Sequence, residues 1–140
     1  ARLKAAGKKA GEEFTKPPFT VECWARLADP GRFNVVVSAD PKSSGDHWEI
    51  YSFAGKGDFS AYLPGYEPHT IRSGHVITDG EWHHLAMTFD GSNVKIFVDA
   101  KQVAASPVTR KGGSKRDPGP LAIGTAYTGG GEVGCNGLID

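Results

Sequence analysis

The sequence predicts an all-β domain, built as an antiparallel sandwich of two sheets. Apolar and polar residues alternate in short segments, and this period of two is typical of strands with one buried face. Turn-forming residues, 19 Gly and 9 Pro, separate these segments without forming a low-complexity tract. No convincing helical pattern and no internal repeat interrupts the series, and about ten short strands of this kind pack as two layers.

The clearest element is a hairpin within residues 81–102. Its strands are expected at 82–90 and 94–99, and each strand places its apolar residues on one face. Asp90-Gly91 supplies the turn between them, because Gly tolerates the positive φ that a short hairpin needs. The apolar residues on these faces are Leu85, Met87, Phe89, Val94, Ile96 and Val98.

The other strands follow from the same spacing of apolar residues and turns. After Pro17-Pro18, the segment 19–28 alternates regularly between apolar and polar residues. A turn at 55–58 joins two further strands into a second hairpin. The remaining strands are expected at 33–39, 48–53, 59–63, 75–77, 102–106, 121–124 and 135–139.

The length of 140 residues predicts a single domain, which can bury enough surface for its own core. Residues 1–13 lack an apolar stripe and are expected to be a flexible lead-in, so the domain is expected over 14–140. The chain begins at Ala1 without an apolar signal segment, as a processed or excised fragment would.

Charge and hydropathy exclude several partners. The 16 basic and 16 acidic residues cancel, so nothing global recruits nucleic acid or an anionic membrane. No apolar run is long enough to span a bilayer, so membrane insertion is not expected either.

The topology predicts where a ligand would bind. If every connection reverses the chain direction, loops 40–47, 64–74 and 108–119 emerge at one end of the sandwich, together with the Gly91 turn. Long loops on a rigid scaffold commonly carry binding residues. We therefore predict a binding rim formed by these three loops, with mostly tight turns at the opposite end.

Aromatic residues of this rim are candidates for sugar binding, because exposed rings can stack on pyranose rings beside hydrogen-bonding groups. Trp48 stands at the mouth of the first loop, whereas Tyr66 and His69 lie in the second. Arg72, also in the second loop, is the expected polar partner. The alternative for each ring is partial burial within the domain.

Four further aromatic residues are interpreted differently. Tyr51 and Tyr62 lie on the second face of their hairpin and can line an open face of the sheet. Trp24 and Trp82 are expected to pack inside the domain instead.

Arg110 and Lys111 begin a cationic stretch that ends at Arg116. Such a loop can grip acidic or sulfated glycans, and the alternative is a solvated loop without a ligand. Nucleic acid is a weaker hypothesis, because the stretch has no aromatic residues interleaved for base stacking.

Acidic residues of the same rim can form a calcium site. Calcium takes six to eight oxygen ligands from loops, and Asp40 and Asp46 bracket the best local candidate. Asp117 in the third loop and Asp90 at the nearby turn complete the predicted set. The alternative is ordinary turn formation by Asp, Ser and Gly.

The two cysteines, Cys23 and Cys135, lie in predicted strands near opposite ends of the chain. Terminal strands are often neighbours in a sandwich, so we predict a disulfide between them and an oxidising, exported location. Closing so long a loop contributes roughly 4–5 kcal/mol in the chain-entropy model. Two buried free thiols are the alternative.

The ordered motifs resemble laminin-G-like, concanavalin-A-like jelly rolls. Phe19-Thr-Val-Glu-Cys-Trp24 resembles the entry strand, and the central hairpin is matched by Glu81-Trp-His-His84, Phe89-Asp-Gly91 and Ile96-Phe-Val-Asp99. Leu121-Ala-Ile-Gly124 and Cys135-Asn-Gly-Leu-Ile-Asp140 resemble the strands that follow. The version with both cysteines is similar to domains embedded in large exported proteins of planctomycete-type bacteria.

The resemblance implies a non-catalytic module, often glycan-binding or adhesive and often with a calcium ion at one rim. The chain departs from the family pattern at two places. The closing strand usually continues past Ile139-Asp140, so it is expected to be cut short here. Asp99-Ala100 replaces the usual Asp-Gly, which costs of order 1 kcal/mol if Ala100 needs positive φ.

Catalysis is not expected. Jelly-roll glucanases place two carboxylates on one strand facing one cleft, about 5–5.5 Å apart in retaining enzymes. Glu22 and Glu49 each stand alone on their strands, and no Gly-x-Ser-x-Gly motif is present. His83-His84 cannot close on one metal ion, because adjacent strand residues point to opposite faces.

The sequence therefore favours a secreted or periplasmic binding module, with a glycan as ligand and calcium as a possible cofactor. The second hypothesis is a structural module that packs against neighbouring domains or subunits. Exposed apolar patches would distinguish that module from a glycan-binding one.

Overall fold

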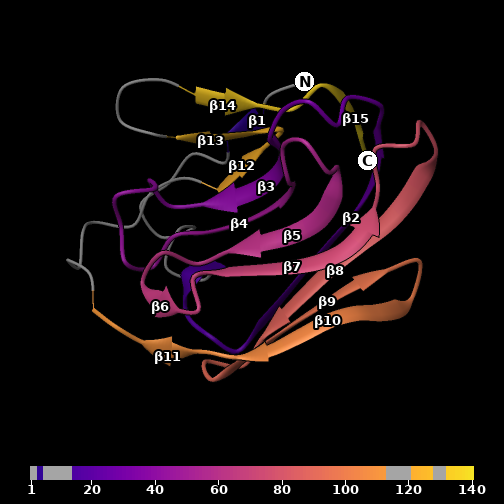
Figure 1. Cartoon of the computed structure of the whole chain (residues 1–140). Coiled ribbons are helices and arrows are strands. Elements are labelled where there is room, and N and C mark those ends of the chain that lie inside the picture. The colour runs from indigo at the N-terminus through magenta and orange to yellow at the C-terminus, as the bar shows by residue number, and fades with distance from the viewer. Residues whose placement is uncertain (1–2, 5–13, 113–120, 128–131) are drawn as a thin grey trace.

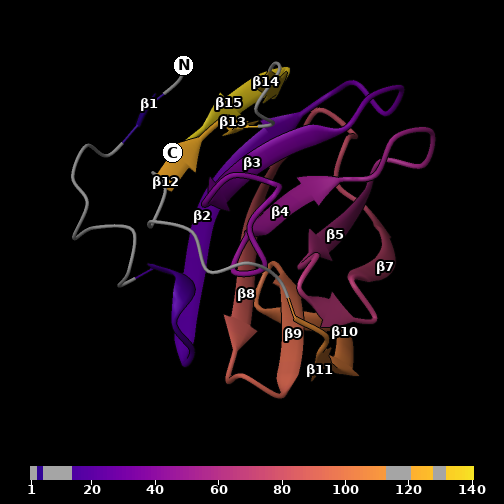
Figure 2. The same ribbon diagram turned by 90° about the vertical axis from the view of Figure 1, so that its left-hand side faces the viewer.

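The computed structural model describes residues 3–4, 14–112, 121–127 and 132–140, and all structural statements concern these residues. Two antiparallel sheets face each other (Figures 1 and 2), which confirms the predicted β-sandwich. Among these residues, the structure contains no helix long and apolar enough to cross a membrane.

The first sheet has six strands in the order β1-β12-β3-β4-β5-β7. Their bounds are β1 (Leu3–Lys4), β12 (Leu121–Ile123), β3 (Asn34–Ala39), β4 (Trp48–Ser52), β5 (Asp58–Tyr62) and β7 (Thr70–Val76). The strands pair antiparallel throughout, and β3, β4 and β5 form the centre of the sheet.

The second sheet has five strands in the order β10-β9-β8-β2-β15. Their bounds are β10 (Lys101–Pro107), β9 (Asn93–Val98), β8 (Trp82–Phe89), β2 (Phe19–Leu27) and β15 (Gly137–Ile139). Two small sheets complete the fold, one of β6 (Tyr66–Glu67) with β11 (Thr109–Arg110) and one of β13 (Thr125–Tyr127) with β14 (Glu132–Gly134).

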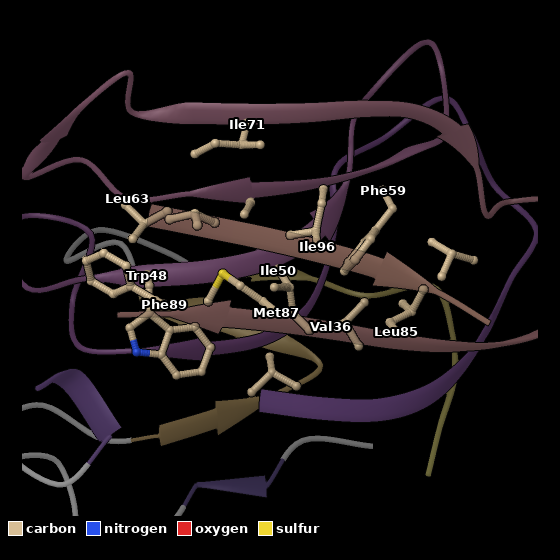
Figure 3. Close-up of a cluster of buried hydrophobic side chains, with 14 of the residues drawn as sticks. Val36, Trp48, Ile50, Phe59, Leu63, Ile71, Leu85, Met87, Phe89 and Ile96 are labelled. Carbon is tan, nitrogen blue, oxygen red and sulfur yellow. The ribbon is translucent and has the colours of Figure 1, made fainter. Parts of the chain in front are cut away.

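The core lies between the two large sheets (Figure 3). Phe59 and Ile50 from the first sheet meet Met87 and Ile96 from the second, and all four are fully buried. The alternation along β9 and β2 places apolar residues in this layer and polar residues outside, as predicted for half-buried strands.

The first sheet is covered on both of its faces at β3. All residues of β3 and β4 are buried, because β13 and β14 lie against the outer face of β3. A second apolar cluster of Val35, Tyr51 and Ala126 forms there, with Phe53, Tyr62 and Val133 packed around it. This cluster is what positions the candidate site described below.

Several short strands were not predicted from the sequence. Leu3–Lys4 pairs with β12, so this part of the predicted flexible lead-in is an edge strand, while most of residues 1–13 lie outside the described ranges. β7 is longer than the expected 75–77, because the polar residues around Ile71 conceal its alternation. The other additions are β6, β11, β13 and β14.

The turn between β9 and β10 has positive φ at both central residues, 50° at Asp99 and 66° at Ala100. The expectation that Ala100 occupies a position suited to Gly is therefore confirmed.

Candidate functional site: an aromatic groove on the outer face of the first sheet

A groove of about 260 Å³ lies on the outer face of the six-stranded sheet. We call it the outer groove and define it by its lining residues: Phe33, Lys42, Glu49, Tyr51, Phe53, Tyr62, Thr70 and Val133. Five of these side chains come from β4, β5, the start of β7 and β14, while Phe33, Lys42 and Phe53 come from the segments beside the strands. Rigid strands therefore hold most of the lining in place.

Aromatic rings form one end of the groove. Phe33 is 44% exposed and meets Phe53 edge to face, with ring centres 5.3 Å apart. The Tyr51 ring lies 5.9 Å from Phe33 and is itself 4% exposed. Phe33 is therefore the ring with an open face, and the others fix its position.

Two ion pairs set the electrostatics of this face. Lys42 Nζ lies 2.9 Å from Glu49 Oε1 and 5.4 Å from the centre of the Tyr62 ring. Arg72 donates through Nε to Asp58 Oδ2 at 3.1 Å and through Nη2 to Oδ1. Both carboxylates are almost fully buried, at 4% and 2% side-chain exposure, so each is neutralised where it lies.

The tyrosine hydroxyls of the groove remain protonated. Burial, followed by the negative charge of Glu49, raises the pKa of both Tyr51 and Tyr62 above the usual tyrosine value. Neutral phenols both donate and accept hydrogen bonds, so these groups suit a ligand rich in hydroxyls.

The predicted loops do meet at one rim. Arg110 Nη1 lies 2.7 Å from Asp46 Oδ1 and donates to the Tyr66 hydroxyl at 3.2 Å. A side chain at Gly65 would place its Cβ 2.0 Å from the Gly45 carbonyl oxygen, so two of the loops touch through their backbones. The 113–119 part of the third loop lies outside the described residues.

The predicted ligand-binding residues are dispersed around this rim. Tyr66 is 8% exposed and packs edge to face on Phe89, whereas His69 is exposed beside Tyr62. Lys111 is exposed and pairs with Glu67 at 3.4 Å. A ligand role for these residues, and for Arg72 and Arg110, stays a prediction.

The expectation that Trp48 presents an open ring is wrong. Its indole is 2% exposed and lies between the two sheets near Phe89 (Figure 3). The ring packs against Phe19 with centres 5.1 Å apart, so it belongs to the core. His47, in the loop that precedes Trp48, is buried as well.

The acidic residues predicted for calcium do not form a ligand set in the described chain. Among those residues, no group of three or more His, Cys, Asp or Glu is placed to hold a metal ion. Asp46 is engaged by Arg110, and Asp90 accepts the backbone amides of Ser92 and Asn93. Asp40 accepts the Ser44 hydroxyl, and Asp117 lies outside the described ranges.

The structure has Cys23 and Cys135 as free thiols, so the predicted disulfide is not formed in it. Both pack against the core. Burial, followed by the neighbouring Cys135, raises the pKa of the Cys23 thiol to about 12.

Trp24 and Trp82 do not pack inside the domain as expected. They lie on the outer face of the five-stranded sheet and are 49% and 42% exposed. Trp24 pairs with His84 across the strands and Trp82 pairs with Arg26, which brings the two indoles to diagonal positions. Leu138 on the adjacent β15 is 56% exposed. Together they form an apolar patch opposite to the outer groove.

A second hollow, of about 370 Å³, lies near the β8–β9 turn. Its lining includes Phe19 and Phe89, but both rings pack into the core. Asp90, its acidic residue, is already bound by the turn amides. This hollow therefore offers a ligand less than the outer groove does.

Tyr51 and Tyr62 do share the face that lines the groove, as expected for the second face of their hairpin, although Tyr51 is only 4% exposed. We did not predict Phe33, Phe53 or Lys42 as lining residues. The period of two gave a usable signal for Phe53, because Glu49, Tyr51 and Phe53 are two residues apart. Phe33 was expected as the first residue of a strand at 33–39, but β3 begins at Asn34 and Phe33 lies just before it.

The two facing antiparallel sheets define a β-sandwich of the jelly-roll type. A family profile described as the concanavalin A-like lectin/glucanases superfamily, of the Laminin_G_3 type, matches residues 6–140. The chain therefore belongs to this family. No curated protein matches it significantly.

Several solved structures share the fold. The CBM40 domain of the Ruminococcus gnavus IT-sialidase, solved with α2,3 sialyllactose, has a TM-score of 0.72 and 11% identity, over 93% of this chain and 76% of that chain. Domain 4 of AbnA, a GH43 extracellular arabinanase from Geobacillus stearothermophilus solved with arabinotriose, has a TM-score of 0.58 and 16% identity, over 88% and 57%. Domains LG4-5 of the mouse laminin alpha1 chain have a TM-score of 0.53 and 11% identity, over 87% and 34%. At these identities the likeness concerns the fold alone.

Proposed function

We propose that this domain is a non-catalytic glycan-binding module and that its ligand occupies the outer groove. The observation that carries the proposal is the exposed Phe33 ring beside Tyr51, Phe53 and Tyr62 in one hollow. A sugar ring has an apolar C–H face and a hydroxyl rim. The aromatic end of the groove can pack against the C–H face, while Glu49, Thr70 and the tyrosine hydroxyls can hydrogen-bond to the sugar hydroxyls.

Domains of similar fold support the ligand class. One was solved with sialyllactose and another with arabinotriose, and their proteins act on or bind saccharides according to their names. They also suggest an exported protein, because the arabinanase is extracellular. Affinity for a single sugar face is expected to be modest, and repetition of the domain would raise it.

The proposal that the domain is not catalytic rests on the ion pairs and hydrogen bonds of its buried acidic residues. Glu49 is bound to Lys42 and His47, and Asp58 is bound to Arg72 and the Gly74 amide. Burial alone would raise the pKa of Asp58, but the hydrogen bonds from Arg72 and Gly74 outweigh it and lower that pKa. A carboxyl that stays ionised cannot act as the general acid of a glycosidase.

We also propose that a calcium ion bound at the neighbouring rim assists glycan binding. For Asp46 to join a calcium site, Arg110 would have to release its carboxylate. Calcium is therefore tested as a separate arm of the binding experiment, and glycan binding in the outer groove is expected without it.

The experiment is a glycan-array screen of the folded domain with calcium and again with a chelator. Phe33→Ala removes the open ring and should weaken binding of any positive glycan about tenfold, which corresponds to ~1.4 kcal/mol. Trp24→Ala removes an equally exposed ring from the opposite face and should leave binding unchanged. Equal affinity of the Phe33→Ala variant would show that the groove is not the site.

A second candidate function is docking to a neighbouring domain or subunit. The patch of Trp24, Trp82 and Leu138 favours it, because large exposed apolar side chains gathered on one sheet face mark interaction surfaces. Arg26 lies between Trp82 and Leu138 in the strand register, and its Nε donates to the Gly80 carbonyl at 2.6 Å.

Hydroxyl-radical footprinting can test this second function. We expect Trp24 and Trp82 to be oxidised rapidly in the isolated domain and slowly within the full natural gene product. Phe33 provides the internal comparison, since the outer groove would remain open in both. Equal oxidation of both tryptophans in the two samples would exclude a docked neighbour on this face.

A further inference from the structure

We infer that the outer groove selects neutral saccharides and discriminates against those that carry a carboxylate, such as sialylated glycans. The inference rests on the proposed glycan-binding function and adds the ligand class. It goes against direct transfer from the sialyllactose-bound domain of similar fold.

The described cations at the groove already have partners. Lys42 Nζ lies 2.9 Å from Glu49 Oε1. Arg72 makes a two-pronged contact with Asp58 and stacks on Phe53 with its guanidinium carbon 3.8 Å from the ring centre. A ligand anion would therefore have to share each cation with a carboxylate that already neutralises its charge.

Separating Glu49 or Asp58 from its cation is energetically unfavourable. The Glu49 and Asp58 side chains are 4% and 2% exposed, so water does not replace a lost cation. A buried charge without its partner is strongly unfavourable. A ligand carboxylate would also approach the negative Glu49, and like charges brought together are repulsive.

In the described part of the rim beyond the groove, each of the two cations also has an anionic partner. Arg110 is held by Asp46 at 2.7 Å and by the Tyr66 hydroxyl. Lys111 lies 3.4 Å from Glu67. These pairs are more exposed than those of the groove, so they are weaker, but they leave no net positive charge toward a ligand.

The groups that remain available to a ligand are uncharged or accepting. Phe33 offers a ring face, Thr70 and Tyr62 offer hydroxyls, and Glu49 offers the acceptor lone pairs that its contacts with Lys42 and His47 leave free. A carboxylate acceptor pairs well with sugar hydroxyl donors, because charge-assisted hydrogen bonds are strong. These groups can hydrogen-bond to hydroxyls, but they offer no unpaired positive charge to a ligand anion.

The test uses matched glycans. Arrayed neutral oligosaccharides are compared with their α2,3- and α2,6-sialylated forms, followed by titration of the folded domain with lactose, arabinotriose and sialyllactose. We expect the neutral members to bind at least tenfold tighter. Their affinity should change little between about 0.05 and about 0.5 M salt, because no ion pair forms with the ligand.

Two variants sharpen the result. Glu49→Gln frees Lys42 and should raise the relative affinity for the sialylated member several-fold, with a salt dependence that the wild type lacks. If that variant does not fold, Asp58→Asn frees Arg72 for the same comparison. Loss of neutral binding in Phe33→Ala, with Trp24→Ala unchanged, places the measured binding in the groove.

The outcomes are distinguishable. Tighter binding of the sialylated members by the wild type, weakened by salt, overturns the inference and leaves the glycan-binding function standing. Absence of binding to every arrayed glycan by the folded domain overturns the proposed function and the inference together.

Discussion

Arg72 covers the ring of Phe53, with its guanidinium carbon 3.8 Å from the ring centre. The same guanidinium neutralises Asp58 from the neighbouring strand β5. One side chain therefore closes an aromatic surface and compensates a buried charge, which links the shape of the outer groove to the stability of the sheet.

Replacing Arg72 by Ala should lower the melting temperature by several degrees at pH 7, because Asp58 is left buried and unpaired. Arg72→Lys should recover only part of the loss, since an ammonium cannot make the two-pronged contact.

The contribution of this ion pair to stability should depend on pH. The lowered pKa of Asp58 contributes stability above the ordinary carboxyl pKa of about 3.9, and this stability is lost as pH falls through the folded-state pKa. Thermal unfolding followed by circular dichroism should therefore show the difference between the wild type and Arg72→Ala shrinking as pH falls below about 3.9. Identical melting curves at neutral pH would contradict this account.

His83 should make the domain more stable in mild acid than in mild base. Burial alone would lower its pKa, but hydrogen bonds to Asp99 at 2.8 Å and Asp79 at 3.0 Å outweigh burial and raise it. Its contribution is complete below the ordinary histidine pKa of about 6.5 and disappears as pH rises through the folded value. Both aspartates have lowered pKa values, so their contributions are present above about 3.9 and are lost in stronger acid.

Urea unfolding across this pH range provides the measurement. The wild type should be most stable between about pH 4 and 6.5, and His83→Gln should flatten the decline toward pH ~8. His75 also acts on Asp99, so His75→Gln serves as the control for a general histidine effect. An unchanged decline in the His83→Gln variant would exclude the proposed role.

Both cysteines should resist thiol reagents in the folded domain. The thiolate is the reactive form, and with a pKa of about 12 Cys23 is almost entirely protonated near neutral pH. Burial raises the pKa of Cys135 as well. Alkylation with iodoacetamide should be slow in buffer and rapid in denaturant, with two labels per chain by mass spectrometry. Two missing labels in denaturant without reductant would instead show that the predicted disulfide forms in solution.

Ala100→Gly should stabilise the domain by about 0.5–1 kcal/mol, because a left-handed conformation costs Ala more than Gly. The reverse change at the other hairpin, Gly91→Ala, should destabilise it, since Gly91 has a φ of 100° and a Cβ there would lie 3.3 Å from Pro17 Cγ. Chemical denaturation of the two variants should give shifts of opposite sign. A loss of stability in Ala100→Gly would mean that flexibility gained by the unfolded chain outweighs the relief of strain.

The fold was predictable because its information is local. Alternating residues identified β2, β8 and β9, and turn residues identified the hairpins between them. The convergence of the rim loops also followed, since it needs only the direction of each strand. Two-residue strands such as β6 and β11 were not predictable, because pairing with a distant segment forms them and no periodicity exists over two residues.

The site was less predictable because exposure depends on packing between distant segments. Trp24 is in phase with the polar residues of its strand and faces outward, whereas Trp48 is in phase with Ile50 and faces the core, and we had expected the reverse. The alternation indicated which residues of a strand share a face. It did not indicate that β13 and β14 cover part of the first sheet. That cover decides which side of the sheet has a groove.

The hairpin of β13 and β14 forms a two-stranded sheet separate from the two main layers. Its residue Val133 nevertheless forms one wall of the outer groove. Insertions or substitutions in this hairpin can reshape that wall without altering the register of any strand in the sandwich. This one wall of the groove can therefore vary independently of the sandwich strands, whereas the lining that β4, β5 and β7 supply cannot.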